Sequence, residues 1–237
     1  RHLVRDGTIG PVRLVQVEYI QSKLATRLED GPINNRLRWI LDPARSGQAL
    51  VMSAIGCHAQ HLACFVAGDR VARVAADVGT LVPGRKVVDH VSALLAFEGG
   101  ARGTLTATNA AAGSENDIRL RVVGERGLLE WSHREASYLK LALQGEPVRT
   151  IGRGDAGLPA DIVALGRTPR GHPEGLREAF ANLYAEVAQE RMARELGEPV
   201  PELPYPRIDD GAHTMAFIEA CIASHARGGW VEVARLG

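Results

Sequence analysis

The pattern of apolar and polar positions predicts strands in the middle of the chain and helices on either side. After Gly10-Pro11, segment 12–20 is rich in β-branched residues and predicts a strand. Alternating apolar and polar positions predict further strands at 71–78, 88–97, 101–109, 117–123, 127–131, 138–143 and 148–151. Two glycine-containing turns, 98–100 and 124–127, are typical of β-hairpins.

Helical spacing of apolar residues predicts three longer helices. The first runs from about Ala49 to Ala67 and is closed by Gly68. The second begins near Pro173, and its apolar positions are Leu176, Phe180, Leu183, Tyr184 and Val187. The third spans 209–225, with an apolar stripe of Met215, Ile218 and Ile222. Segments 21–38 and 152–171 lack such periodicity and predict loops.

This order of elements predicts an α+β domain built on an open, predominantly antiparallel sheet with helices packed on one face. A doubly wound parallel sheet would require strands and helices to alternate, and they do not. On the strand at 101–109, Arg102, Thr104, Thr106 and Thr108 share one face. We therefore expect the uncovered sheet face to meet water or a second copy of the chain, which makes a homo-oligomer.

Composition excludes several classes of protein. The chain is 45% hydrophobic, which is enough for a packed core. Lys and Arg total 28 and so do Asp and Glu, so the basic excess of a nucleic-acid-binding protein is missing. No segment approaches the roughly 20 apolar residues of a membrane span. The three cysteines show no disulfide framework, which predicts reduced thiols and a cytoplasmic location.

Two local patterns suggest cofactor or metal binding. Segment 152–157 matches the spacing G-x-G-x-x-G, but Pro159 follows at once and no second strand–helix unit comes after it, so we interpret it as a loop. Cys57, His61 and Cys64 fall on one face of the first helix and could ligate a metal. A structural zinc site usually gathers its ligands from two elements, so a metalloenzyme is the third hypothesis here.

Gly56 and His58 are the most informative residues of the same helix. A glycine inside a helix costs about 1 kcal/mol relative to alanine, so we expect close packing or close ligand approach at Gly56. His58 is either a hydrogen-bonded, half-buried histidine or a general acid/base in a pocket.

Motifs in a fixed order extend over nearly the whole chain. They are Trp39–Gly47, Ile55–Ala59, His61-Leu62, Phe65-Val66, Gly68, Pro83–Arg85, Asp89-His90, Phe97–Gly103, Val123–Trp131, His172–Gly175 and Glu178–Tyr184. In this order they resemble the C-terminal domain of the glucose–fructose oxidoreductase and inositol dehydrogenase family, Gfo/Idh/MocA.

The resemblance implies an NAD(P)-dependent oxidoreductase that acts on a sugar, a polyol or a related hydroxy compound. It implies that residues 1–10 end a crossover helix between two domains, and that 11–237 form one substrate-side domain that also builds oligomers. The dinucleotide-binding domain would then precede Arg1 and be absent from this sequence. We expect NAD or NADP to be bound mainly by that absent domain, and this chain alone to be inactive.

The resemblance also assigns roles to individual residues. It makes His58 the catalytic residue that handles the proton of the substrate hydroxyl, with His61, His172 and Trp39 as substrate-binding neighbours. Where members of the family commonly read Asp-x-Gly-x-His, this chain has Ala54 in place of the carboxylate, and their Trp-Arg is Trp39-Ile40 here. Two hypotheses follow: a divergent enzyme that uses His58 without the carboxylate, or a non-catalytic binding or oligomerisation module.

Overall fold

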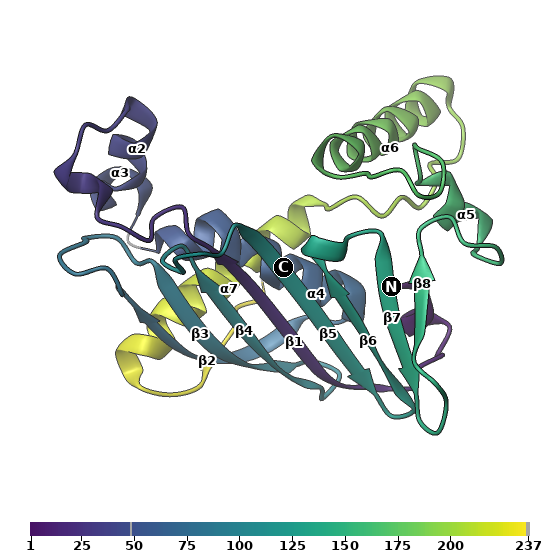
Figure 1. Ribbon diagram of the computed structural model, residues 1–237, viewed down its shortest axis with the longest axis horizontal. Coiled ribbons are helices and arrows are strands. Elements are labelled where there is room, and N and C mark those ends of the chain that lie inside the picture. Colours follow the sequence, from purple (N-terminus) through teal and green to yellow (C-terminus); the bar gives the residue numbers. More distant parts are fainter. Residues whose placement is uncertain (48, 236–237) are drawn as a thin grey trace.

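The computed structural model describes residues 1–47 and 49–235, which fold around one nine-stranded sheet (Figure 1). The strand order is β8-β7-β6-β5-β1-β4-β3-β2-β9. The strands are β1 Val12–Gln21, β2 Val71–Gly79, β3 His90–Phe97, β4 Arg102–Thr108, β5 Asn116–Gly124, β6 Gly127–Ser132, β7 Tyr138–Leu143, β8 Arg149–Gly152 and β9 Val231–Glu232. Neighbouring strands are antiparallel except β1 and β4, which pair in parallel with Leu14 opposite Arg102.

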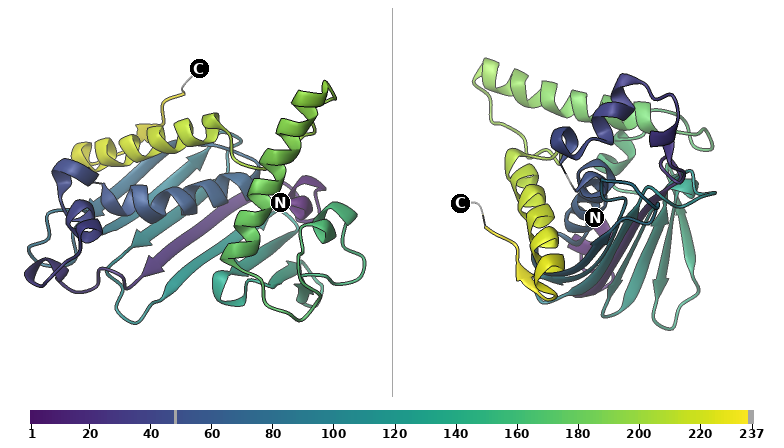
Figure 2. Two further views of the ribbon diagram at one scale, coloured as in Figure 1. Left: turned by 90° about the horizontal axis from the view of Figure 1, so that it is seen from above. Right: turned by 90° about the vertical axis from the view of Figure 1, so that its left-hand side faces the viewer.

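Two helices, α4 (Cys57–Ala67) and α7 (Ile208–Arg227), lie on the same face of the sheet (Figure 2). The core between these layers includes Val15, Leu105 and Val122 from the strands and Ala59 and Phe217 from the helices, all fully buried. The opposite face of the sheet carries no helix (Figure 2). The predicted α+β class, with its open and mostly antiparallel sheet, is therefore confirmed.

Two polar side chains of α7, the buried Ser224 and the exposed His225, fix it against the edge of the sheet. The Ser224 hydroxyl accepts a hydrogen bond from the backbone N–H of Ala76 at 2.8 Å, and His225 Nδ1 accepts one from Val78 N–H at 3.1 Å. Because β9 is only two residues long, these side chains satisfy donors of β2 that no strand reaches. On the other side of α7, the Thr214 hydroxyl donates to Gln60 of α4 at 2.7 Å.

The helices that do not pack on the sheet face lie in two groups at opposite ends of the sheet (Figure 1). The turn η1 (Leu28–Asp30) and the helices α2 (Asn35–Ile40) and α3 (Pro43–Ser46) lie at one end, and α5 (Ala160–Ala164) and α6 (Leu176–Leu196) at the other. The side chains of Asn34 and Asp42 cap α2 and α3 by accepting backbone N–H groups. The elements α1 (His2–Arg5), η2 (Met52–Gly56) and η3 (His133–Glu135) complete the described structure.

The structure corrects several details of the sequence-based expectations. The predicted loops 21–38 and 152–171 contain η1, the start of α2, and α5. The stripe expected on α7 is wrong, because Met215 and Ile222 are 54% and 42% exposed while Phe217 and Cys221 are fully buried. Helix α6 forms close to where it is predicted, but its apolar positions face outward, and Leu176 and Tyr184 are more than 70% exposed. No described helix has the length and hydropathy needed to cross a membrane.

Candidate functional site

A hollow of about 420 Å³ opens at the sheet end where β1 and β4 terminate, beside the helical turn that precedes α4. Its walls come from the end of β1, from the segment after β4, from the helical turn Met52–Gly56 and from the loop and helix that follow β1. The lining residues are Tyr19, Gln21, Lys23, Leu24, Arg36, Trp39, Ile40, Ser46, Leu50, Ser53, Ala54, Ile55 and Asn109. The sheet thus supplies the polar groups of the floor, and the irregular segment 22–46 forms the rim.

Arg85 holds this rim in place. Its side chain is fully buried and donates to the carbonyl oxygens of Leu24 at 2.5 Å and Thr26 at 2.8 Å. It also forms ion pairs with Glu29 at 2.9 Å and Asp89 at 3.1 Å. One guanidinium group therefore joins several points of segment 24–29 to the sheet end, and it satisfies backbone oxygens that would otherwise lack a partner.

His58 lies beside the hollow on the exposed side of α4. Ala54 is four residues earlier, so the two side chains lie one above the other on the helix. The ring centroid of His58 is 6.3 Å from that of Tyr19, whose hydroxyl donates to Asn116 at 2.8 Å. His58 makes no side-chain hydrogen bond with any residue that the structure describes, so its ring nitrogens are available to a ligand.

The backbone before His58 forms a wide turn of π-helix, Met52–Gly56. A Cβ added to the buried Gly56 would lie 3.2 Å from the sulfur of Met52 and 3.5 Å from the carbonyl oxygen of Val51. Close packing, rather than a ligand, therefore explains this glycine. Turns of this kind occur often at functional sites, and here the turn directs Ser53 and Ala54 toward the hollow.

The other predicted site residues lie in different surroundings. Trp39 lines the hollow and is 51% exposed. His61 does not line it; its ring stacks on Phe65 with centroids 6.0 Å apart, and burial lowers the pKa of His61. His172 is exposed in the segment between α5 and α6, where its carbonyl oxygen accepts a hydrogen bond from Arg153 at 2.7 Å. Trp39 and Ala54 line the hollow, and His58 lies next to Tyr19 in its wall. His172 does not line this hollow.

The cysteines of α4 do not form a common site with His61. The Cys57 thiol donates to the carbonyl oxygen of Ser53 at 3.1 Å, whereas Cys64 accepts from Gln60 and burial raises the pKa of its thiol to about 11. Within residues 1–47 and 49–235, no group of three or more His, Cys, Asp and Glu side chains is placed to hold a metal ion. The metal hypothesis thus finds no support in this geometry.

The G-x-G-x-x-G segment is a turn that follows β8. The backbone N–H of Gly152 donates to the carboxylate of Asp155 at 2.7 Å, and α5 begins only at Ala160. A dinucleotide site needs the turn to open directly into a helix, so the interpretation of this segment as a loop agrees with the geometry.

The sequence analysis did not single out several residues that line the hollow. Lys23 and Arg36 lie in a segment predicted only as a loop, and Asn109 lies at the end of a predicted strand. No motif marks them, and only the folding of segment 22–46 over the sheet end brings them together. The one available signal was the excess of basic residues in that segment.

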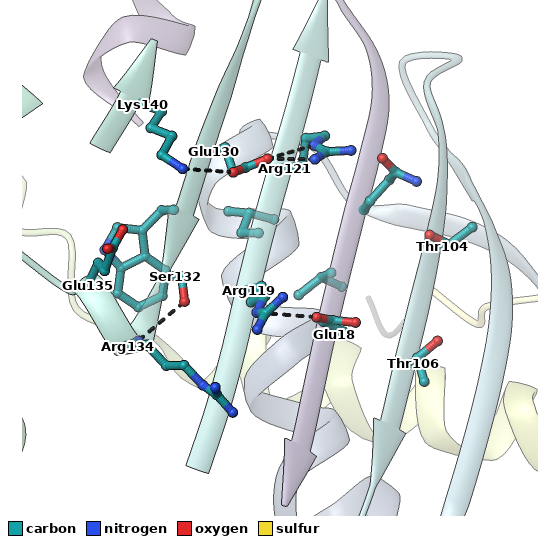
Figure 3. A pocket seen from close by; sticks show the side chains of 14 residues that line it. Glu18, Thr104, Thr106, Arg119, Arg121, Glu130, Ser132, Arg134, Glu135 and Lys140 are labelled. Atoms are coloured by element: carbon teal, nitrogen blue, oxygen red, sulfur yellow. Dashed lines mark hydrogen bonds and ion pairs between the residues drawn. The ribbon is translucent and has the colours of Figure 1, made fainter. Parts of the chain in front are cut away.

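A second and larger hollow, of about 540 Å³, lies on the open face of the sheet (Figure 3). Its charged side chains pair with one another: Arg119 with Glu18 at 3.5 Å, and both Arg121 and Lys140 with Glu130, at 2.6 and 3.6 Å. Thr104 and Thr106 of β4 border these pairs. The face is polar, and most of the charges that line this hollow are compensated within the chain, whereas Glu135 has no ion pair among the described residues.

Comparison with known proteins places this chain and its fold in one family. Residues 1–130 match the GFO/IDH/MocA C-terminal domain. The chain is 31% identical to the uncharacterized oxidoreductase YfiI of Bacillus subtilis over 98% of its own length. It also resembles a structure of an inositol dehydrogenase homolog from Azotobacter vinelandii in complex with NAD+, with 30% identity over 98% of the chain and a TM-score of 0.88.

A second structure of the Azotobacter vinelandii homolog, in complex with NADH and myo-inositol, is 29% identical over 98% of the chain, with a TM-score of 0.82. The chain spans about 60% of the length of these relatives. The match and the shared sheet agree with the resemblance inferred from the ordered motifs. The chain belongs to the Gfo/Idh/MocA oxidoreductases and corresponds to their C-terminal part.

Proposed function

We propose that this chain is the substrate-side domain of an NAD(P)-dependent oxidoreductase that acts on a sugar, a polyol or a related hydroxy compound. The observation that carries the proposal is the position of His58, exposed beside a polar hollow and without an internal hydrogen bond among the described residues. The Azotobacter vinelandii homolog crystallised with NADH and myo-inositol supports the class of substrate. "Parent protein" below means the longer protein of which this chain would be the C-terminal part.

His58 would act on the proton of the substrate hydroxyl that is oxidised. An imidazole nitrogen accepts that proton while the carbon loses a hydride, and a base in this position typically contributes about 10²- to 10⁴-fold to the rate. Tyr19 lies against the ring of His58, and its own hydroxyl is directed to Asn116, so it limits where the imidazole can turn. Trp39, His61 and His172 stay as proposed substrate-binding neighbours, His61 and His172 from outside this hollow.

The described residues do not provide a site for the dinucleotide. The sheet is antiparallel apart from the β1–β4 pair, and the one G-x-G-x-x-G segment is a turn without a helix behind it. A nicotinamide cofactor supplies the hydride acceptor in such a reaction. We assign its binding, and the choice between NAD and NADP, to the rest of the parent protein, and we expect this chain alone to be inactive.

A non-catalytic binding or oligomerisation module is the second candidate. Ala54 and Ile40 both line the hollow at positions where the resemblance implies a carboxylate and an arginine. Without that carboxylate, no charged side chain lies one helical turn before His58. A protein that had lost its chemistry while keeping the fold would show this combination.

The open face of the sheet supports a homo-oligomer. Several of its charges already pair within the chain, so a second copy could cover Glu18, Arg119, Arg121, Glu130 and Lys140 without leaving any of these five isolated. The cytoplasmic location stays a prediction that rests on the odd number of cysteines.

The two candidates are separated by kinetics of the parent protein with NAD+ and NADP+ on a panel of sugars and polyols. We expect His58→Ala to lower kcat about 10²-fold or more, and Ala54→Asp to raise it. His225→Ala, at the far end of α7, is the matched control and should leave kcat unchanged. Equal rates for the wild type and His58→Ala would remove the catalytic assignment, and no turnover with any compound would favour the module.

A further inference from the structure

The hollow beside His58 is lined by positively charged side chains and by no negatively charged ones. Lys23 and Arg36 line it, and its lining contains no Asp or Glu. Neither cation forms an ion pair with a carboxylate within the part of the chain that the structure describes. Both side chains are exposed and could also donate to the hydroxyls of a neutral sugar, but hydrogen bonds from a cation to an anion are stronger, so the two cations favour a ligand with negative charge.

The carboxylates near these cations are already engaged elsewhere. Segment 22–46 contains five basic and three acidic residues. Glu29 pairs with the buried Arg85 at 2.9 Å, Asp30 with Arg27 at 3.0 Å and Asp42 with Arg45 at 3.4 Å. Because every acid of the segment pairs with another arginine, Lys23 and Arg36 stay available to an anion.

Asn109 provides an independent indication that the hollow binds a polar ligand. It is 3% exposed, and its backbone is fixed by hydrogen bonds to Asp89 and Leu24, at 3.0 and 2.9 Å. Its side-chain amide lines the hollow and forms no hydrogen bond with a described residue. Because this amide reaches the hollow and has no protein partner among the described residues, a ligand hydroxyl or carboxylate oxygen can take the place of water there.

The remaining residues that line the hollow suit the hydroxyl groups and the ring of a sugar. Gln21 donates to Asn116 at 2.9 Å and keeps its amide oxygen for a ligand hydroxyl, and Ser53 is exposed toward the hollow. Trp39 adds a half-exposed aromatic ring at the rim. The site therefore combines hydroxyl-binding groups on the sheet with cations on the loop.

Resting on the proposed function, we propose that the substrate is a polyhydroxylated compound that carries an anionic group, either a carboxylate or a phosphate. Lys23 and Arg36 bind the anion at the rim, and Asn109 binds a hydroxyl or anion oxygen at the floor. The reacting hydroxyl then lies at the side of the hollow nearest His58. The site prefers an anionic ligand to a neutral sugar because only the anion forms charge-assisted hydrogen bonds with the two cations.

The test uses the ¹⁵N-labelled chain and three probes that share one ring: D-glucose, D-glucuronate and D-glucose 6-phosphate. Dissociation constants come from amide chemical shifts at 50 mM NaCl. At least one anionic probe should bind about tenfold or more tightly than D-glucose, since a hydrogen-bonded charge contributes more than a neutral group. The anionic probe that binds more tightly shows whether the anion is a carboxylate or a phosphate. The ratio of its affinity to that of D-glucose should decrease at 500 mM NaCl.

The variant Lys23→Gln/Arg36→Gln should lose this advantage and bind D-glucose as the wild type does. Lys86→Gln/Arg102→Gln removes two exposed cations that do not line the hollow and should keep the advantage. If D-glucose binds as well as both anionic probes, the anionic substrate is refuted while the proposed sugar site stands. If no probe shifts the amides around Asn109, both proposals fail.

Discussion

The side chains of Arg85 and Asp89 form an ion pair that is completely buried, with Nη1 3.1 Å from Oδ2. Asp89 also accepts the backbone N–H groups of Leu81 and Val82, at 2.7 and 3.2 Å. Through Arg85, this group of hydrogen bonds reaches Leu24 on the rim of the candidate site. The rim of the hollow therefore depends on charges that water does not reach.

We expect Arg85→Met to lower the free energy of unfolding by about 3–5 kcal/mol, because the buried Asp89 would lose its counter-charge. Urea unfolding followed by circular dichroism measures this change. Arg13→Met is the control, since its ion pair with Glu125 is exposed and should contribute less than about 1 kcal/mol. Equal losses in the two variants would contradict the importance of the buried pair.

Stability at acidic pH should depend on Glu190 of α6. Its carboxylate accepts hydrogen bonds from Tyr205, Arg194 and Arg207, which lower its pKa from 4.5 to about 2. A carboxyl group with a lowered pKa stabilises the fold above its unfolded pKa of 4.5, and this contribution is lost as the pH falls toward 2.

Thermal unfolding between pH 6 and pH 2 tests this pH dependence. Glu190→Gln should flatten the pH dependence between 4.5 and 2, whereas the exposed Glu198→Gln should leave it as in the wild type. A titration of the Glu190 carboxyl carbon by NMR with a midpoint near 4.5 would show that the hydrogen-bonded cluster does not hold in solution.

The proposed oligomer places Leu94 in a contact between copies. Leu94 is 53% exposed on the open face of β3, opposite Thr104 in the sheet register. A lysine there would put an unpaired charge into the contact, so Leu94→Lys should dissociate the oligomer in sedimentation equilibrium. Val148→Lys, at a 65% exposed position between β7 and β8, is the control. A wild-type chain that is monomeric at every concentration would refute the proposal.

Much of the fold could be predicted because period-two patterns and turn residues are local signals. The strand from Tyr138 to Leu143 has the predicted ends, and the other predicted strands differ by a few residues. The burial of α7 could not be predicted from its apolar stripe. Its inner face combines the large Phe217 and Ile218 with small or polar residues such as Ala220 and Ser224, and the Ser224 hydroxyl bonds to the sheet backbone.

The residues of the candidate site also differ in whether the sequence alone could predict them. The resemblance proposes His58 because the motif around it is contiguous, and in the structure His58 lies next to Tyr19 in the wall of the hollow; its catalytic role stays a prediction. Asn109 and Arg36 are 73 residues apart in the sequence and carry no motif, so only the tertiary fold could show that they line one hollow. His172 lies in a recognisable motif, yet it does not line this hollow. A motif therefore does not reveal where its residue lies in the folded chain.

The parallel pairing of β1 with β4 has a consequence for how the protein is made. Strand β1 is synthesised first, yet its two neighbours, β4 and β5, end at Thr108 and Gly124. At typical synthesis rates of about 5–20 residues per second, both edges of β1 stay unpaired for roughly five to twenty seconds on the ribosome. An unpaired apolar strand is prone to wrong pairing, so the centre of the sheet is the part of this protein with the greatest need of a chaperone during translation.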